Sequence, residues 1–279
     1  MGKYIQQTDM DAYRFYLASM EKSLATIEKY LRDINGFCSF AGGRTITKEL
    51  VIAYKEKLIA RYAVASVNSM LAAINGFLSF AGYGCCRVRQ VRTQRRAYCH
   101  ANTQLTKSEY LRLVDAAAKT GDERLNLILQ SICATGMRVS ELAFLTVDAL
   151  WAGRAEVCLK GKTRTVLIPG KLQKRLKQYI KRHKIESGPI FVTANGKAVN
   201  RSNIWKAMKR LCAAANVEPG KVYPHNLRRL FARTFYHIKK DIAKLADVLG
   251  HSRIETTRIY IMETGEEHVR IVSKLGLVA

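Results

Sequence analysis

The stretch "LGHSRIETTRIYI", residues 249–261, places His251 directly after a glycine and Tyr260 one short helical run later. Ser252 as N-cap and Glu255 three residues on form a capping-box pattern, which predicts a helix between them. Taken alone, the pair has a structural interpretation: a tyrosine packs and bonds through its hydroxyl, and a histidine is commonly a polar surface residue. The rest of the chain decides whether the two act together.

Charge is the strongest global signal. The 279 residues carry 47 Lys and Arg against 22 Asp and Glu, a net charge of +25, and the pI is near 10.0. Such a balance favours a polyanionic partner, usually nucleic acid, over a merely solvated or membrane-facing basic surface. The basic residues gather in "RVRQVRTQRR" (87–96) and "KLQKRLKQYIKRHK" (171–184), and two separate tracts suit a groove around a duplex. The predicted DNA-binding residues are Arg87, Arg89, Arg92, Arg95, Arg96, Arg164, Lys174 and Lys177.

Several protein classes do not fit the composition. At 48% hydrophobic residues the chain can bury a core, yet no apolar run approaches the roughly 20 residues of a membrane span. The polar start "MGKYIQQTDMD" lacks the apolar centre of a secretory signal. Seven scattered cysteines without a CxxC indicate neither a disulfide framework nor a zinc site, and the group Cys85, Cys86, Cys99, His100 lacks ligand-like spacing. We expect a soluble protein that binds no membrane, metal or cofactor.

Residues 1–90 are predicted to form a helical DNA-binding domain. Apolar residues recur at helical spacing from residue 8 to about 86, with a Thr8–Asp9 cap at the start. An echo links "INGFCSFAGG" (34–43) to "INGFLSFAGYG" (74–84). Two similar helix hairpins would produce it, with phenylalanines facing a shared core and glycine ending each helix.

The Arg-rich residues 91–104 are predicted to be a linker, and 105–279 a second domain. Here Thr106 caps one helix and Gly136 ends the next. "AEVCLKGKTRTVLIPG" (155–170) has two β-rich runs joined at its lysines, which predicts a hairpin, and helices resume from 171. The fold class expected is therefore mainly α (α+β): an amino-terminal helical domain plus a mixed helical domain with a small antiparallel sheet.

Three further motifs accompany the opening stretch. "ATGMRVSELAFL" presents Arg138 just after a glycine, with Glu141 three residues on; "YPHNLRRLFARTFYHI" places His225 and Arg228 on one helical face. Lys160 and Lys162 stand at the predicted hairpin tip. Each motif alone is more typical of a solvated surface. What they share is a polar group presented at a turn beside a strongly apolar segment.

Together these groups suit chemistry on a phosphodiester. Two arginines offer charged planar forks for its non-bridging oxygens. A tyrosine can attack phosphorus, and because its ordinary pKa is about 10, a histidine can help remove its proton. A lysine on the hairpin can protonate the departing 5′ oxygen. This scheme requires no carboxylate-bound Mg²⁺.

In order and spacing, Arg138 in "TGMRVSEL", His225 and Arg228 in "HNLRR", His251 in "LGHSRIETT" and Tyr260 resemble the boxes of the tyrosine recombinase (phage integrase) family, in its Xer-like two-domain form. The resemblance covers about 105–265, and residues 8–86 more loosely resemble the family's core-binding domain. It implies that Tyr260 forms a 3′-phosphotyrosyl bond and releases a 5′ hydroxyl. It also implies roles for the other members of the set: Arg138 and Arg228 bind the scissile phosphate, Glu141 supports them, His225 handles the tyrosine proton, His251 bonds the phosphate, and Lys160 is the general acid.

Two positions depart from the family pattern. The hairpin turn is a residue short, so Lys162 competes with Lys160, which better preserves the distance to Arg164. Arg229 follows the second arginine where the family often has histidine. The final "GEEHVRIVSKLGLVA" resembles the family's terminal helix, and its apolar residues suit docking either on a neighbouring subunit or back on their own domain.

The resemblance implies a site-specific recombinase that acts on double-stranded DNA as a homo-tetramer, through a Holliday junction and without ATP or metal. It further implies a cytoplasmic, nucleoid-associated protein of bacterial or mobile-element origin. A type IB topoisomerase and a catalytically silent DNA-binding regulator are the alternatives. The target site, and the choice among integration, resolution and inversion, stay open.

Overall fold

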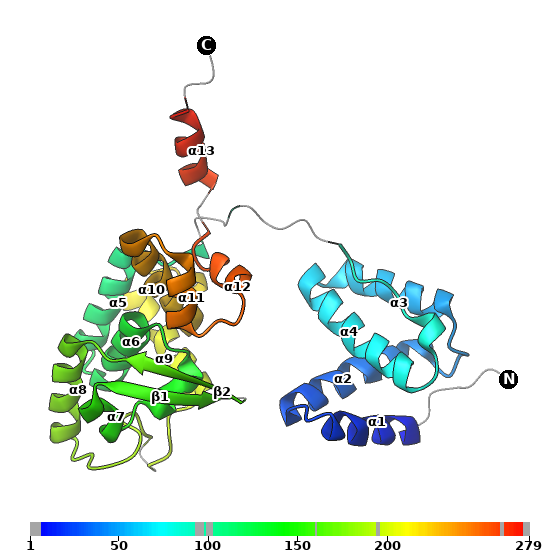
Figure 1. Ribbon diagram of the computed structural model, residues 1–279, viewed down its shortest axis with the longest axis horizontal. Helices are drawn as coiled ribbons and strands as arrows, with labels where there is room; N and C mark the ends of the chain where they lie inside the picture. Colours follow the sequence, from blue (N-terminus) through cyan, green and yellow to red (C-terminus); the bar gives the residue numbers. More distant parts are fainter. Residues whose placement is uncertain are drawn as a thin grey trace. The chain divides into compact units, whose positions relative to one another are not determined.

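The computed structural model describes residues 7–92, 98, 103–159, 161–193, 196–262 and 265–275. The chain divides into two compact units, Met1–Arg95 and Arg96–Ala279, and each is considered by itself (Figure 1). Within the described ranges, no helix combines the length and apolarity that crossing a membrane requires.

The amino-terminal unit is helical, as the apolar spacing predicts. Its elements are α1 (Gln7–Ser19), α2 (Leu24–Ala41), α3 (Lys48–Arg61), α4 (Val64–Phe80) and the 3-10 turn η1 (Gly84–Cys86). Gly42 ends α2 in the left-handed conformation, with φ of 57°, as expected for glycine. The predicted Thr8–Asp9 cap is wrong, because both residues lie inside the first turn of α1.

The echoed sequences are matching helices that pack together, α2 and α4. Phe37 and Phe77 are both fully buried. The glycine before each has a steric reason: a Cβ would lie 3.0 Å from the Tyr54 hydroxyl at Gly36, and 2.8 Å from the Tyr13 hydroxyl at Gly76. The repeat thus encodes two helices that each receive a tyrosine from another helix of the unit.

The carboxy-terminal unit is mainly helical with one two-stranded sheet, which confirms the predicted fold class. Its helices are α5 (Lys107–Lys119), α6 (Glu123–Thr135), α7 (Val147–Ala152), α8 (Gly170–Arg182), α9 (Arg201–Ala214), α10 (Pro224–Lys239), α11 (Ile242–Leu249), α12 (Ile254–Arg258) and α13 (Gly265–Ser273). Its 3-10 turns are η3 (Val139–Phe144) and η4 (Pro219–Lys221). The strands are β1 (Arg154–Leu159) and β2 (Lys162–Leu167), antiparallel with Leu159 opposite Lys162.

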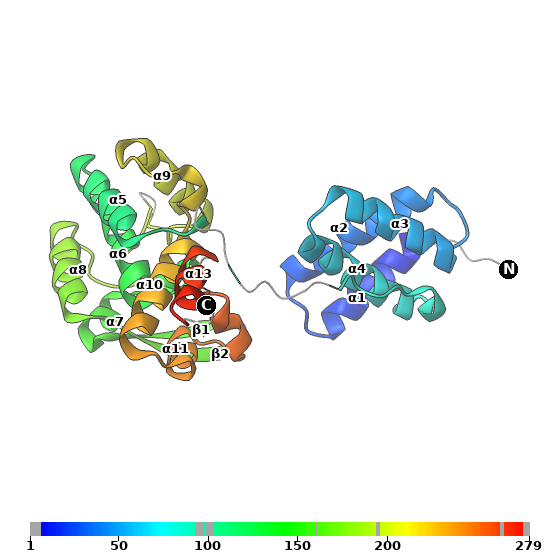
Figure 2. The same ribbon diagram turned by 90° about the horizontal axis from the view of Figure 1, so that it is seen from above.

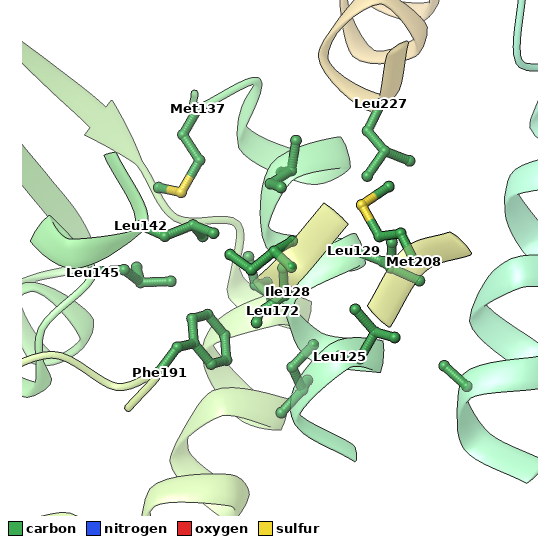
Figure 3. Close-up of a cluster of buried hydrophobic side chains, with 14 of the residues drawn as sticks. Leu125, Ile128, Leu129, Met137, Leu142, Leu145, Leu172, Phe191, Met208 and Leu227 are labelled. Carbon is green, nitrogen blue, oxygen red and sulfur yellow. The ribbon is translucent and has the colours of Figure 1, made fainter. Parts of the chain in front are cut away.

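Helix α6 runs through the core of this unit. Its side chains Leu125, Ile128 and Leu129 meet residues of α8, α9 and α10 (Figure 3). Thr106 caps α5 with a full capping box, and Gly136 ends α6 with φ of 66°, as the sequence predicts. A buried central helix gives rigid support to the turns at its carboxyl end, where Arg138 lies.

The hairpin lies beside α11, and α10, α11 and α12 gather at the same side of the unit (Figures 1 and 2). Gly250 ends α11 with φ of 63°, and His251 follows it. The expected Ser252 capping box is wrong: α12 begins one residue later, with Arg253 at the N-cap position and no side-chain cap. The short helix is instead held through Thr257, described below.

Candidate active site

Arg138 and Glu141 form a closed unit at the end of α6. Arg138 is the N-cap of η3, and Glu141 accepts hydrogen bonds from its backbone N (2.7 Å) and its Nη1 (2.7 Å). Glu141 is 1% exposed, whereas the Arg138 side chain is 40% exposed. Burial alone would raise the pKa of Glu141, but the bonds from Arg164 and Arg138 outweigh it and hold that pKa below its ordinary value. A buried carboxylate therefore holds an arginine whose side chain stays partly exposed.

Arg228 is among the most deeply buried charged residues of the described chain, at 1% exposed. Its Nη1 donates to the Gly136 carbonyl (2.5 Å) and its Nη2 to the Leu249 carbonyl (2.6 Å), so it joins the ends of α6 and α11. Burial and the neighbouring Arg138 lower its pKa to about 10, which leaves it protonated at neutral pH. Within the described residues, its buried Nε has no hydrogen-bond partner.

His251 links Arg228 to α12. Its Nε2 lies 3.0 Å from Arg228 Nη2, and its Nδ1 lies 2.9 Å from Thr257 Oγ1. An arginine can only donate, so Nε2 accepts and Nδ1–H donates to the threonine, which defines a neutral tautomer. The pKa agrees, since burial and Arg228 lower it to about 4.

Tyr260 follows α12 and is 7% exposed. Its backbone N donates to the Thr257 carbonyl (2.9 Å), so one threonine positions both His251 and the tyrosine segment. The Tyr260 ring centroid lies 5.0 Å from that of His251 and 5.0 Å from that of His225. The guanidinium carbons of Arg228 and Arg229 each lie 5.9 Å from the ring centroid. Three residues predicted from two motifs, His225, Arg228 and His251, thus meet around one tyrosine, together with Arg229.

His225 stands in the first turn of α10, just after Pro224. Burial of part of its ring, followed by Arg229 and Arg228, lowers its pKa to about 4. A neutral imidazole next to a tyrosine is able to accept a proton. Arg229 therefore contributes to the electrostatics that keep His225 neutral.

The hairpin forms as predicted, with Gly161 in the left-handed conformation at its turn (φ 71°). Lys160 lies outside the described residues, and Lys162 begins β2. The choice between the two lysines as general acid stays a prediction.

Residues 87–92, which carry Arg87, Arg89 and Arg92 of the first tract, follow η1 without helix or strand, and we call them the strap. Asn75 exchanges two hydrogen bonds with the Val88 backbone (2.8 and 3.0 Å), and Asn68 exchanges two with the Val91 backbone (2.9 and 2.8 Å). The arginines of the strap are exposed: Arg87, Arg89 and Arg92. Arg95 and Arg96 lie outside the described residues.

The second set is placed differently. Lys174 is exposed on α8, and Lys177 stacks over the exposed Trp151 ring, 4.2 Å from its centroid. Arg164 does not fit the predicted DNA contact, because its side chain is only 11% exposed and is bonded to Glu141 and to Val248.

Sequence reasoning missed Thr257, Asn68 and Asn75. The spacing of Thr257, three residues before Tyr260 and six after His251, was the available signal. The repeated sequence does not distinguish Asn75 from Asn35, and Asn35, at the equivalent position of the first copy, is exposed. The parts of the chain that the structure describes hold no cluster of three His, Cys, Asp or Glu side chains that would suit a metal ion.

Comparison with known proteins agrees with this geometry. The model of the phage integrase family matches residues 103–267, and that of the phage integrase N-terminal SAM-like domain matches 10–82. Tyrosine recombinase XerA of Pyrococcus furiosus is 29% identical over 181 residues, 62% of this chain and 62% of that protein. A tyrosine recombinase of Thermosipho africanus is 28% identical over 267 residues, 94% of this chain and 89% of that one. The chain matches less than two thirds of the XerA relative's length.

Solved structures share the fold. The XerH recombinase bound to its difH substrate in a pre-cleavage complex superposes with a TM-score of 0.70 at 19% identity, covering 96% of this chain and 84% of that one. A lambda integrase tetramer bound to a Holliday junction gives 0.75 at 18% identity, covering 92% and 77%. At these identities the likeness is one of architecture.

Proposed function

Because the chain belongs to the phage integrase family, we propose that it is a site-specific DNA recombinase that breaks and rejoins strands through a 3′-phosphotyrosyl bond at Tyr260. The observation that carries the proposal is the enclosure of Tyr260 by His225, His251 and Arg228. A purely structural tyrosine would not need two neutral histidines and a buried arginine around its ring.

The proposed reaction begins with the tyrosine hydroxyl. A phenol has an ordinary pKa of about 10, so attack at neutral pH needs a base. The rings of His225 and His251 are equally close to Tyr260, and His225 is the candidate because both ring nitrogens of His251 already bond Arg228 and Thr257. As Tyr260 bonds to phosphorus, the bond to the 5′ oxygen breaks, and Lys160 donates the proton that this oxygen takes. The reverse reaction, with a 5′ hydroxyl from another strand, rejoins the DNA and regenerates the tyrosine.

The arginines would stabilise the pentacoordinate phosphorane. Arg138 is bonded to Glu141, and its side chain stays partly exposed. The buried Nε of Arg228, which lacks a partner within the described residues, is a donor that a phosphate oxygen can satisfy. His251 Nε2 accepts from Arg228 in the free protein, so to bond a phosphate oxygen it would first take up a proton, which the negative charge of the bound phosphate favours.

We also propose a tetramer that pairs two DNA sites and exchanges strands through a Holliday junction. Support comes from the architectural likeness to a lambda integrase tetramer on such a junction. The apolar residues Val269, Val272 and Leu275 of the carboxy-terminal segment are exposed, which suits docking on a neighbouring subunit.

The test is capture of the covalent intermediate. Nicked duplexes from the DNA flanking the protein's own gene are incubated with the protein, and SDS-resistant protein–DNA adducts are counted. Wild type and Tyr236→Phe, a control in the same apolar cluster as Tyr260, should form the adduct, and Tyr260→Phe should not. Tight binding without any wild-type adduct would contradict the proposal and favour a silent regulator. Relaxation of supercoiled plasmid without strand exchange between two sites would favour a type IB topoisomerase.

A further inference from the structure

Arg164 lies on β2, at the centre of the hydrogen bonds that join the site's parts. Its Nη2 and Nε donate to the two carboxylate oxygens of Glu141 (2.5 and 3.3 Å). Its Nη1 donates to the Val248 carbonyl, 2.6 Å away, in the last turn of α11. One guanidinium therefore connects the hairpin, the η3 turn and the end of α11.

The contact with α11 is close as well as polar. A Cβ on Gly250 would lie 2.4 Å from Arg164 Cδ, so the arginine stem packs directly against the turn that precedes His251. A side chain at position 250 would push the two apart. The left-handed φ of 63° independently favours glycine here.

Glu141 divides its oxygens between two arginines. Oε1 accepts from Arg138 Nη1 and Arg164 Nε, and Oε2 accepts from the Arg138 backbone N and Arg164 Nη2. A carboxylate at 2% side-chain exposure that is held from both sides has one orientation. Without Arg164, the Glu141 carboxylate would lose half of its donors and would be able to rotate away from Arg138.

The geometry points to Arg164 as a positioning residue for the recombinase function proposed above, on which this inference rests. Arg164 fixes Arg138 through Glu141, and it fixes His251 through the Val248–Gly250 turn. Both residues thereby keep set positions relative to the hairpin. Arg164 acts without touching DNA. A displacement of about 1 Å in such a frame is able to slow a reaction by about 100-fold.

The experiment compares Arg164→Lys and Arg164→Met with Arg154→Met on the same hairpin. Arg154 is the matched control, because it is exposed and pairs only loosely with Glu156, at 3.6 Å. Single-turnover adduct formation and the Kd for the cleavable nicked duplex are measured for each. We expect both Arg164 variants to lose about 10- to 100-fold in cleavage rate with Kd changed less than about threefold, and the control to match wild type.

A double-mutant cycle with Glu141→Gln gives the second readout. Because Arg164 is inferred to act partly through Glu141, the rate losses of Arg164→Met and Glu141→Gln should combine to less than their product. Arg164→Lys keeps a cation beside Glu141, so this variant tests the inference even if Arg164→Met does not fold. Unchanged cleavage or strictly multiplicative losses would overturn the inference. So would weaker DNA binding with a smaller slope of log Kd against log salt, because that result signals a direct contact between Arg164 and a phosphate. A wild-type protein that forms no adduct would overturn the proposed function instead.

Discussion

The two units differ in which polar side chains they bury and in what those side chains bond. In the amino-terminal unit, the half-buried amides of Asn68 and Asn75 bond the backbone of the strap and leave its arginines exposed. In the carboxy-terminal unit, Glu141 and Arg228 are themselves buried beside other charged groups. Buried ion pairs contribute little net stability compared with apolar packing. The first unit thus fixes the positions of exposed charges, whereas the second keeps buried charges at a cost in stability, which fits the catalytic role proposed for them.

The largest expected effect is at Arg228. Arg228→Lys should lower the rate of adduct formation by about 10³-fold or more, because one ammonium cannot replace a guanidinium that bonds two carbonyls and, in the proposed reaction, a phosphate. Arg233→Lys is the control on the same helix, since Arg233 donates to the Leu105 carbonyl. Single-turnover cleavage measures both. A loss of equal size in the control would mean that α10 packing, and not the site, is being measured.

The general acid comes next. Lys160→Ala should slow cleavage by about 10²- to 10⁴-fold, and a substrate with sulfur at the bridging 5′ position should restore the rate, because a thiolate leaves without needing a proton. Lys162→Ala should retain most activity on ordinary DNA. Rescue of Lys162→Ala in place of Lys160→Ala would reverse the assignment.

A smaller effect is expected in the amino-terminal unit. Asn75→Ala frees the strap at Val88 and should weaken DNA binding by about tenfold, and the slope of log Kd against log salt should fall by about 0.9 for each phosphate that the strap no longer neutralises. Asn35→Ala, at the echoed and exposed position, should bind as wild type does. Equal Kd values and slopes for both variants would show that the strap does not bind DNA.

The last expected effect is on stability, not on binding or cleavage, and depends on pH. His225 and His251 have folded-state pKa values of about 4, below the 6.5 of the unfolded chain. Between these values the unfolded chain binds more protons, so these residues lower stability as the pH falls from 6.5 towards 4, and they have no such effect above 6.5. The drop in Tm from pH 7 to pH 5 should shrink in His225→Gln/His251→Gln. An unchanged drop would contradict the neutral tautomers.

The sequence predicts the site better than its supports. Motif order predicts Arg138, His225, Arg228, His251 and Tyr260 as the site, and the structure brings His225, Arg228 and His251 around Tyr260, whereas their catalytic roles stay predictions. Arg164 bonds Glu141 and Val248, which lie 23 and 84 residues away in the chain and which no local pattern encodes, whereas the partners of Thr257 lie within six residues. The Ser252 cap was wrong because α12 begins one residue later, and a bond within the same segment, between His251 and Thr257, anchors the short helix.

The most direct test of the central claim is to identify the residue that carries DNA. The trapped adduct is digested with trypsin and nuclease, and the nucleotide-bearing peptide is sequenced by mass spectrometry. The account predicts the peptide 259–270, which follows Arg258, with a 3′-linked nucleotide on Tyr260. A nucleotide on any other side chain, or an adduct that persists in Tyr260→Phe, would contradict it.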